Sequence, residues 1–305
     1  MIAALLLAFA AFAGADGGSG ATTLKRPLGA RGVSMAGAFS AVKGGLDSLT
    51  YNPAGLAFMN EREARTDYTH GIIDDKFTFL GYGQPLKDAG LAAGLAYYDA
   101  GTVTLKYSSG GSETRRIQQD WVGHLGGGAR FGSLALGAVG RVYRLTLVQE
   151  FKATGAALDA GALWSTPLAG LSLSAAMQNA GPGVKFDRES DPLPLTFRAG
   201  AAYELATERQ QRFDEGESAF QRIVLAGDVI KERDEKIAAA AGLELQMPFG
   251  ARGYGALRTG YVFNRDLDAF SIGLGMREGR FVADYALGVK KALGNDHHIS
   301  LGVRF

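Results

Sequence analysis

Short segments in which every second side chain is apolar recur along this chain, and this pattern constrains the fold most strongly. Side chains of a β-strand point alternately to its two faces, so such a segment is predicted to be a strand with one apolar face. The pattern occurs in residues 195–205, 269–277 and 280–289. It is clearest at the end of the chain, where the alternate apolar residues are Ile299, Leu301, Val303 and Phe305.

The opposite face of these strands distinguishes a soluble sheet from a membrane barrel. It carries glycine, alanine, serine and isolated charges, and the chain has 44 glycines but only 8 prolines. A soluble sheet would present a solvated face rich in lysine, glutamate and threonine. Small side chains with few charges suit the lumen of a barrel whose apolar face contacts lipid. The pattern therefore predicts an all-β, antiparallel barrel in the outer membrane of a Gram-negative-type bacterium.

The predicted barrel has about fourteen strands, an even number, as single-chain bacterial outer-membrane barrels require. Each candidate is about ten residues long, which is enough to cross the membrane when the strand is tilted. The candidates are residues 64–73, 76–85, 90–99, 120–131, 133–143, 156–165, 170–179, 196–205, 221–231, 237–247, 253–263, 268–277, 280–289 and 297–305.

Connections between the predicted strands alternate between short and long. If the first strand runs outward from the periplasm, the periplasmic turns are residues 85–90, 131–133, 166–170, 248–253 and 277–280. The longer extracellular loops are then residues 101–119, 145–154 and 179–194. Residues 206–220 form a long charged connection on the predicted periplasmic side. They are interpreted either as a solvated loop or as an amphipathic helix that contacts a partner.

The N-terminal residues predict export. Residues 1–15, MIAALLLAFAAFAGA, are an apolar run that ends in small residues, which is typical of a secretory signal peptide. The run is too short to span a bilayer as a helix, and a buried apolar helix is the alternative. We interpret residues 16–60 as a flexible spacer followed by a plug, and residues 61–305 as the barrel around it.

The stretch 29–56 fits neither a long helix nor a soluble core. Its 6 glycines and Pro53 favour short pieces and turns. We therefore interpret it as the plug inside the barrel. Pro53 is expected to set a turn, and Asn52 to satisfy neighbouring backbone groups. Ala54 and Gly55 are expected to keep the contact with the wall close.

Isolated charges on the small-residue face are predicted to point into the lumen. An unpaired charge there costs several kcal/mol, so these groups should pair with one another or with the plug. We expect a network that seats the plug through Arg31, Lys43, Asp47 and Asn52. The alternative is a polar path that opens when the plug shifts. The predicted lumen charges are Arg141, Asp159, Arg198, Glu204, Asp228, Glu244, Arg258, Asp284 and Arg304.

Aromatic residues lie near the ends of the predicted strands, where the interfacial girdles of a membrane barrel are expected. Strand propensity alone would explain their enrichment but not this placement. These residues are Tyr97, Tyr98, Trp121, Tyr143, Trp164, Tyr203, Tyr261, Phe263 and Phe281. The terminal Phe305 occupies an apolar-face position and resembles the C-terminal signal that the barrel assembly machinery reads.

Catalytic and cofactor chemistry finds little support in the sequence. No G-x-S-x-G follows a predicted strand, and the absence of cysteine excludes thiolate catalysis and disulfides. The adjacent His297 and His298 would point to opposite faces of a strand, so they do not form a simple metal site. A net charge of +1 offers no basic face for nucleic acid. We therefore predict neither an enzyme nor a cofactor, metal or nucleic-acid binder.

Several motifs resemble the PorV/PorQ proteins, which belong to the wider group of FadL-like outer-membrane barrels. The Asn-Pro-Ala triplet at residues 52–54 matches the plug signature of that family. The resemblance covers essentially the chain after the signal peptide. Its segments are GARG at 29–32, MAGAFSAV at 35–42, DSLTYNPAGL at 47–56, QNAGPGVKF at 178–186, DPLPL at 191–195 and ISLGVRF at 299–305.

The resemblance implies a barrel of about fourteen strands with an N-terminal hatch, together with one of two roles. PorV-type proteins serve type IX secretion, where they receive substrates and pass them to surface attachment, and this is our main expectation. FadL-type proteins take up hydrophobic compounds such as long-chain fatty acids and release them sideways through the wall. The expected partners are outer-membrane lipid, and either a secretion translocon with its substrates or a hydrophobic small molecule. A barrel hydrolase is a third hypothesis, without a catalytic constellation to support it.

Deletion of residues 29–56 is expected to leave a folded barrel that leaks, because a plug closes the lumen without forming the wall. Heat-modifiable migration of the purified variant would report folding, and ion conductance in planar bilayers would report leakage. A variant that no longer folds would show that the stretch is a structural core.

Overall fold

The computed structural model describes residues 18–71, 75–108, 110–206, 222–249, 253–265, 268–290 and 294–305. The helices are η1 (Thr22–Lys25), α2 (Ala30–Ser34), α3 (Ser48–Tyr51) and η2 (Pro53–Phe58). The strands are β1 (Glu63–His70), β2 (Lys76–Pro85), β3 (Ala89–Asp99), β4 (Thr102–Lys106), β5 (Ser112–Arg116), β6 (Gln118–Phe131), β7 (Leu134–Leu147), β8 (Phe151–Ser165), β9 (Leu171–Ala180), β10 (Val184–Lys185), β11 (Ser190–Asp191), β12 (Thr196–Ala206), β13 (Arg222–Glu232), β14 (Ala238–Phe249), β15 (Gly253–Phe263), β16 (Asp268–Glu278), β17 (Phe281–Lys290) and β18 (Gly294–Arg304).

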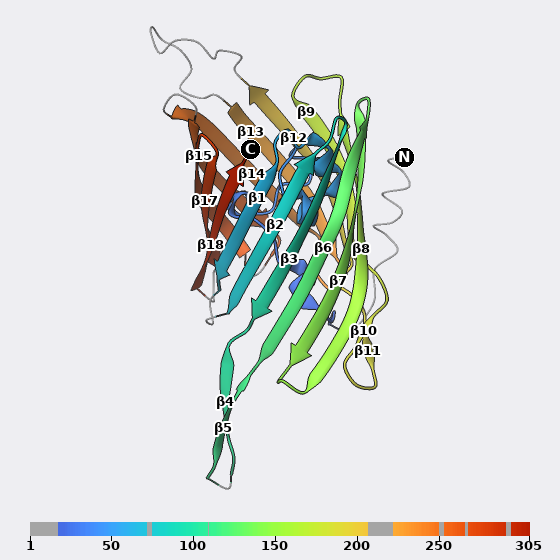
Figure 1. The fold of residues 1–305 in the computed structure, drawn as a ribbon, viewed down its shortest axis with the longest axis vertical. Helices are drawn as coiled ribbons and strands as arrows, with labels where there is room; N and C mark the ends of the chain where they lie inside the picture. Colours follow the sequence, from blue (N-terminus) through green and yellow to red (C-terminus); the bar gives the residue numbers. More distant parts are fainter. Residues whose placement is uncertain are drawn as a thin grey trace.

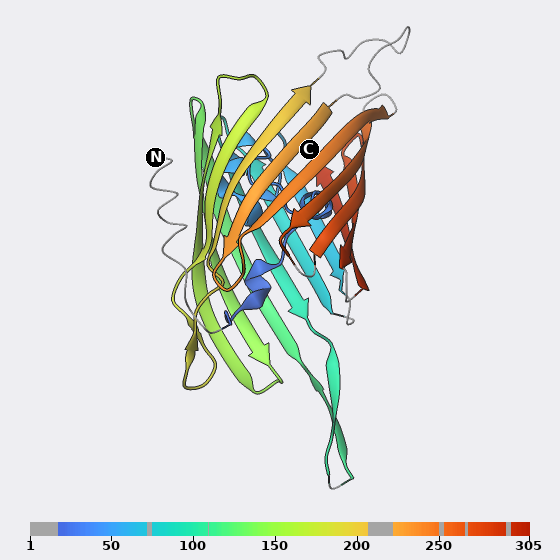
Figure 2. The same ribbon diagram turned by 180° about the vertical axis from the view of Figure 1, so that it is seen from behind.

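Fourteen of the described strands form one closed antiparallel barrel, in the order β1-β18-β17-β16-β15-β14-β13-β12-β9-β8-β7-β6-β3-β2. The first and last barrel strands close the sheet, with Thr66 opposite Leu301. Figure 1 and Figure 2 show the tilted strands from two sides. Closure removes the free edges of the sheet, so every barrel strand has two hydrogen-bonding neighbours. The predicted fold class is confirmed.

The outer surface of the barrel is apolar. Leu80, Leu125 and Phe281 have 65%, 70% and 71% of their side-chain surface exposed. The residues next to Leu80 and Leu125 in sequence point inward, as the alternation predicts. They include small or polar residues such as Gly81 and His124, but also the large apolar Phe79, which is fully buried. Among the described residues, no helix is long and apolar enough to cross a membrane.

Two of the predicted girdle aromatics face the lumen instead. Tyr98 and Tyr143 are 9% and 4% exposed, and both pack in a buried apolar cluster. Their assignment to a lipid-facing girdle is wrong, because the inner face of β3 and β7 is itself apolar near these strand ends. Trp121, Trp164 and Phe263 do face outward and are exposed.

The two ends of the barrel differ in their connections. The end that carries the β6–β7 and β16–β17 turns and the chain terminus at Phe305 is called the turn end. The opposite end is called the loop end, and there the ribbon β4–β5 extends far beyond the barrel (Figure 1). The sequence patterns did not predict this ribbon or the small β10–β11 pair, since both lie within the predicted long loops. The predicted signal peptide and most of the charged connection 206–220 lie outside the described residues.

Residues 21–59, called the inner segment, lie inside the barrel (Figure 2). η1 lies toward the loop end (Figure 2). The helix α2 packs on β15 to β18, and η2 packs on β3 and β6 to β8. Thus the inner segment runs through the lumen from the loop end to the turn end, where it joins β1. Its role as a plug stays a prediction.

Glycines in the wall allow the inner segment to approach the strands closely. A Cβ atom on Gly128 would lie 2.8 Å from the carbonyl oxygen of Pro53. A Cβ atom on Gly137 would collide with the peptide between Pro53 and Ala54. Backbone therefore packs against backbone at these positions, which no larger residue permits without a shift of the inner segment.

The variant Gly137→Ala is expected to destabilise the protein by about 1 to 3 kcal/mol, because the added methyl group overpacks a rigid contact. The temperature at which heat-modifiable migration is lost would measure the effect. Gly255→Ala is the control, since no heavy atom lies within 4 Å of its Cβ position. Equal stability of the two variants would contradict close packing at Gly137.

Candidate functional site in the lumen

The lumen has two chemically different walls. The strands from β12 through β18 to β1 carry most of the buried charged groups, including Glu244 and Arg258. The strands β2, β3, β6, β7 and β8 carry an apolar cluster that includes Phe79 and Tyr143. The first set is called the charged wall and the second the apolar wall. The inner segment lies between them.

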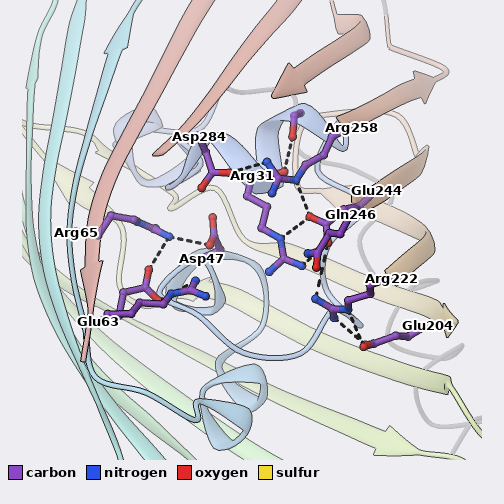
Figure 3. A network of polar contacts seen from close by, with 12 residues as sticks. Arg31, Asp47, Glu63, Arg65, Glu204, Arg222, Glu244, Gln246, Arg258 and Asp284 are labelled. Carbon is purple, nitrogen blue, oxygen red and sulfur yellow. Dashed lines mark hydrogen bonds and ion pairs between the residues drawn. The ribbon is translucent and has the colours of Figure 1, made fainter. Parts of the chain in front are cut away.

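Glu244 of β14 is the centre of the charged wall, as Figure 3 shows. Its carboxylate is fully buried and accepts two hydrogen bonds from Arg31 of α2, at 2.7 Å from Nε and 2.8 Å from Nη2. Arg258 Nε donates to the same carboxylate at 2.6 Å, and Gln246 Nε2 at 2.9 Å. A guanidinium that pairs through two nitrogens fixes both distance and orientation. Glu244 therefore joins the inner segment to the wall.

The network around Glu244 extends along neighbouring strands and balances its charges. Arg258 Nη1 donates to Asp284 at 2.6 Å, and Arg222 Nε donates to Glu204 at 2.6 Å. Arg222 also lies 3.8 Å from Glu244. With Arg31, the network holds three guanidinium groups and three carboxylates, a formal sum of zero.

Burial opposes the charge on Arg31, but the Glu244 carboxylate outweighs it and raises the pKa of the guanidinium above its ordinary value. Burial lowers the pKa of Lys43, whose ammonium lies 5.2 Å from the centre of the Phe58 ring. Lys43 pairs with no carboxylate among the described residues. The expectation that Lys43 joins the seating network therefore stays a prediction.

A second cluster surrounds Arg65 of β1. Arg65 Nη1 donates to Asp47 of the inner segment at 2.8 Å, and its Nε lies 3.0 Å from Asp67. Glu63 lies 3.4 Å from Arg65 and 3.3 Å from Arg304. Sequence reasoning predicted Asp47 and Arg304 but missed Arg65. The signal was present, because Glu63, Arg65 and Asp67 alternate on one face of the first strand.

Two further pairs hold the inner segment through its backbone. Arg141 pairs with Asp159 and donates to the Leu24 carbonyl at 2.9 Å. Arg198 lies 3.6 Å from Asp228 and donates to the Gly37 carbonyl at 3.2 Å. Leu24 lies near the end of η1 and Gly37 in the turn after α2, where carbonyls have no intrahelical donor, so the wall supplies the donors.

The Asn52–Gly55 motif links the inner segment to itself and to β8. Asn52 Oδ1 accepts from the Ala54 amide at 3.1 Å, which caps η2, and Pro53 occupies the first turn. Asn52 Nδ2 donates to the carbonyls of Ser40 at 2.9 Å and Ala162 at 3.1 Å. Pro53 and Ala54 lie over the wall glycines, and the position of Gly55 is crowded by Ser48.

The apolar wall is occupied by side chains of the inner segment. Leu24 and Leu28 are 4% and 0% exposed and pack in the same cluster as Phe79, Val122 and Tyr143. The apolar wall contributes further side chains to this cluster. They are Phe77, Ala92, Ala96, Tyr98, Val139, Leu145, Ala153 and Ala157. The inner segment thus covers a surface that would otherwise be open to the lumen.

Charged residues of η1 and the following turn contact the barrel near the loop end. Lys25 Nζ lies 2.8 Å from Glu232, and Arg26 Nη2 donates to Asp75 at 2.7 Å. The Arg26 guanidinium also stacks on Tyr98, at 3.9 Å from the ring centre. These contacts join the inner segment to both walls. Sequence reasoning missed them, since η1 lies largely in the predicted flexible spacer.

Comparisons with known proteins were made at three levels. No family model matches the chain, and no curated protein matches its sequence. Solved structures do match its fold. The CymD monoaromatic hydrocarbon channel has a TM-score of 0.62 at 14% identity, over 92% of this chain and 98% of that chain. The Pseudomonas putida toluene transporter TodX has a TM-score of 0.60 at 11% identity, over 92% and 99%.

A Pseudomonas aeruginosa FadL homologue also matches, with a TM-score of 0.53 at 11% identity, over 92% of this chain and 98% of that chain. The chain has the fold of FadL-like outer-membrane channels. With its closed barrel and apolar outer surface, it is a protein of the outer membrane. None of the structures named here is a PorV or PorQ protein, so that part of the resemblance stays a prediction.

The variant Glu244→Gln is expected to destabilise the protein by about 3 to 5 kcal/mol, because it leaves Arg31 and Arg258 buried without their shared carboxylate. Thermal loss of heat-modifiable migration would measure this effect. Glu278→Gln, at an exposed position of the turn end, is the matched control and should behave as the unaltered protein. Similar stability of both variants would show that Glu244 does not hold the inner segment.

Proposed function

We propose that this protein is a channel for small hydrophobic molecules across the outer membrane, with the inner segment as its plug. The observation that carries this proposal is the apolar wall inside the lumen. Ion pairs alone could hold a plug in a barrel. They would not require the large apolar surface around Phe79, Val122 and Tyr143. Apolar side chains that face a lumen offer a site for an apolar ligand.

The ligand would occupy the place of Leu24 and Leu28. These side chains bury in the apolar wall, and they belong to the inner segment rather than to the barrel. A hydrophobic molecule that enters from the loop end would compete with them for the same surface. Displacement of η1 would break the contacts of Lys25 and Arg26 and open the loop end.

Neutral molecules fit this wall better than fatty acids do. A carboxylate buried beside an apolar surface needs a cation that is free to pair with it. Two cations next to the cluster around Phe79 already have partners: Arg141 pairs with Asp159, and Arg26 with Asp75. The matching structures named above include a monoaromatic hydrocarbon channel and a toluene transporter, which agrees with a neutral substrate.

An irregularity in the wall lies beside the inner segment and is a candidate exit. The register between β8 and β9 shifts at Leu158 and Ala160, so that two residues oppose Asp159. One of them, Asn179, has a positive φ of 60° and donates from its amide to Asp159 at 2.7 Å. Its neighbour Gln178 donates to the Thr50 carbonyl of the inner segment. Movement of the inner segment would therefore reach this part of the wall directly.

The secretion role of PorV-type proteins is the competing proposal. It predicts a large protein partner rather than a ligand in the lumen. Gentle detergent extraction from the native membrane, followed by a pull-down, separates the two. Recovery of a translocon with this chain would favour secretion, and recovery of the chain alone with a bound hydrophobic compound would favour transport.

The variant Val122→Asn is expected to reduce uptake of radiolabelled toluene roughly tenfold, because an amide on the apolar wall must be desolvated as the ligand passes. Uptake would be measured in cells without other hydrocarbon channels and normalised to the amount of folded barrel. Val262→Asn, which faces the lumen on the charged wall, is the control and should retain uptake. Equal uptake by both variants, or faster uptake of palmitate than of toluene, would contradict the proposal.

A further inference from the structure

A shallow pocket lies on the outer surface of the barrel, at the loop end. It has a volume of about 310 Å³ and is lined by Tyr97, Gln119, Trp121, Arg144 and Thr146. These residues belong to the neighbouring strands β3, β6 and β7, and Trp121 stands opposite both Tyr97 and Arg144 in register. The pocket therefore lies on the lipid-facing surface and is separate from the lumen.

The aromatic side of this pocket is held in place by its own contacts. The rings of Tyr97 and Trp121 lie 4.6 Å apart between centroids and are tilted by 42°. Gln119 Nε2 donates to the Tyr97 hydroxyl at 2.6 Å. The indole of Trp121 remains 47% exposed. The result is a pre-formed surface with an apolar floor and polar groups at its edge.

Arg144 supplies a cation at this edge. It is exposed, and no carboxylate of the described residues pairs with it. The nearby Asp99 is already bound to Arg116, at 2.7 Å. Lys152 of β8 stands opposite Thr146, which makes it a diagonal neighbour of Arg144 on the same face. Tyr97 also donates to Asp99 at 3.4 Å, so one carboxylate lies beside the pocket, and Arg116 balances its charge. Arg144 in the pocket and Lys152 beside it are two further cations that no carboxylate of the described residues pairs with.

On the rest of the outer surface, positive charge is also concentrated at the loop end. On the described parts of the barrel strands, the lysine and arginine side chains that face outward all lie at the loop end. The outward acid near the turn end is Glu278 of β16. Outward-facing cations are therefore concentrated at one membrane interface. They are Lys76, Arg144, Lys152 and Lys231.

We propose that this pocket binds the phosphate group of an outer-leaflet glycolipid of the lipid A type. Short turns lie on the periplasmic side of outer-membrane barrels and long loops outside, so the loop end faces the outer leaflet. Arg144 would pair with the phosphate through two nitrogens, and Lys152 would add a second charge. Trp121 and Tyr97 would contact the apolar part of the lipid below its headgroup.

Lipid binding would be tested with the full-length protein in a non-ionic detergent, by titration with diphosphoryl lipid A and native mass spectrometry. Arg144→Gln is expected to bind about tenfold more weakly, the loss expected for one charged hydrogen-bonded contact. Arg280→Gln, an exposed arginine at the turn end, should bind as the unaltered protein does. Equal binding by the Arg144→Gln variant and the unaltered protein, or an equal loss in both variants, would overturn the proposal.

Two further ligands identify the source of the phosphate. Lipid A without phosphates should bind the unaltered protein and Arg144→Gln equally weakly. Excess inorganic phosphate should leave lipid A bound, since a free ion lacks the contacts with Trp121 and Tyr97. Displacement by inorganic phosphate would indicate a soluble-anion site instead. Equal binding of phosphatidylglycerol would show that the pocket does not select a lipid of the outer leaflet, and either result would overturn the proposal.

The lumen function provides a check on folding. Arg144→Gln should keep heat-modifiable migration and toluene uptake, because Arg144 faces lipid and touches neither wall of the lumen. Loss of lipid A binding with uptake intact would support a separate outer-surface site. Loss of both with a normally folded barrel would show that the two surfaces are coupled, which contradicts a separate site.

Discussion

The structure depends on one buried carboxylate. Glu244 lies inside the barrel without exposure to solvent, and a charge there is stable only with cations beside it. Arg258 comes from a neighbouring strand, but Arg31 comes from the inner segment. The inner segment is thereby part of what makes the charged wall stable. Arg198 of the same wall also donates to the Gly37 carbonyl of the inner segment.

The division of the lumen into a charged and an apolar wall gives the inner segment two different attachments. Ion pairs hold α2 and the residues around Asp47, and their geometry is specific. Hydrophobic contact holds Leu24 and Leu28, and such contact is not directional, so another apolar molecule can replace it. An exchange of this kind could release the loop-end part of the segment while the Glu244 network stays intact. This difference in attachment is the physical basis for the proposed transport.

Strand positions could be read from the sequence because alternation is a local property. The order of apolar and polar residues within one strand shows which side chains lie on each of its two faces. The face that contacts lipid must be apolar along its whole length. The same reasoning misplaced Tyr98 and Tyr143, since both faces of those strands are apolar near the loop end. It missed Arg65 because the first strand was judged by its apolar residues rather than by its three alternating charges. The β4–β5 ribbon has no buried face and so leaves no such pattern.

The sequence by itself determined the class of fold: short alternating strands, an even number of them, and a glycine-rich N-terminal stretch without a long helix. The structure adds that this stretch forms short helices and that its apolar side chains, such as Leu46 and Leu49, are buried in the core. Alternation also indicated several charges on the inward faces of strands, among them Glu244 and Arg258, but it did not identify all of the buried charged groups. Only the tertiary structure decided which of those charges meet. Arg31 and Glu244 are 213 positions apart in the chain, and their pairing depends on how the barrel closes around the inner segment. Such contacts arise from register, tilt and closure, which are properties of all fourteen described barrel strands together.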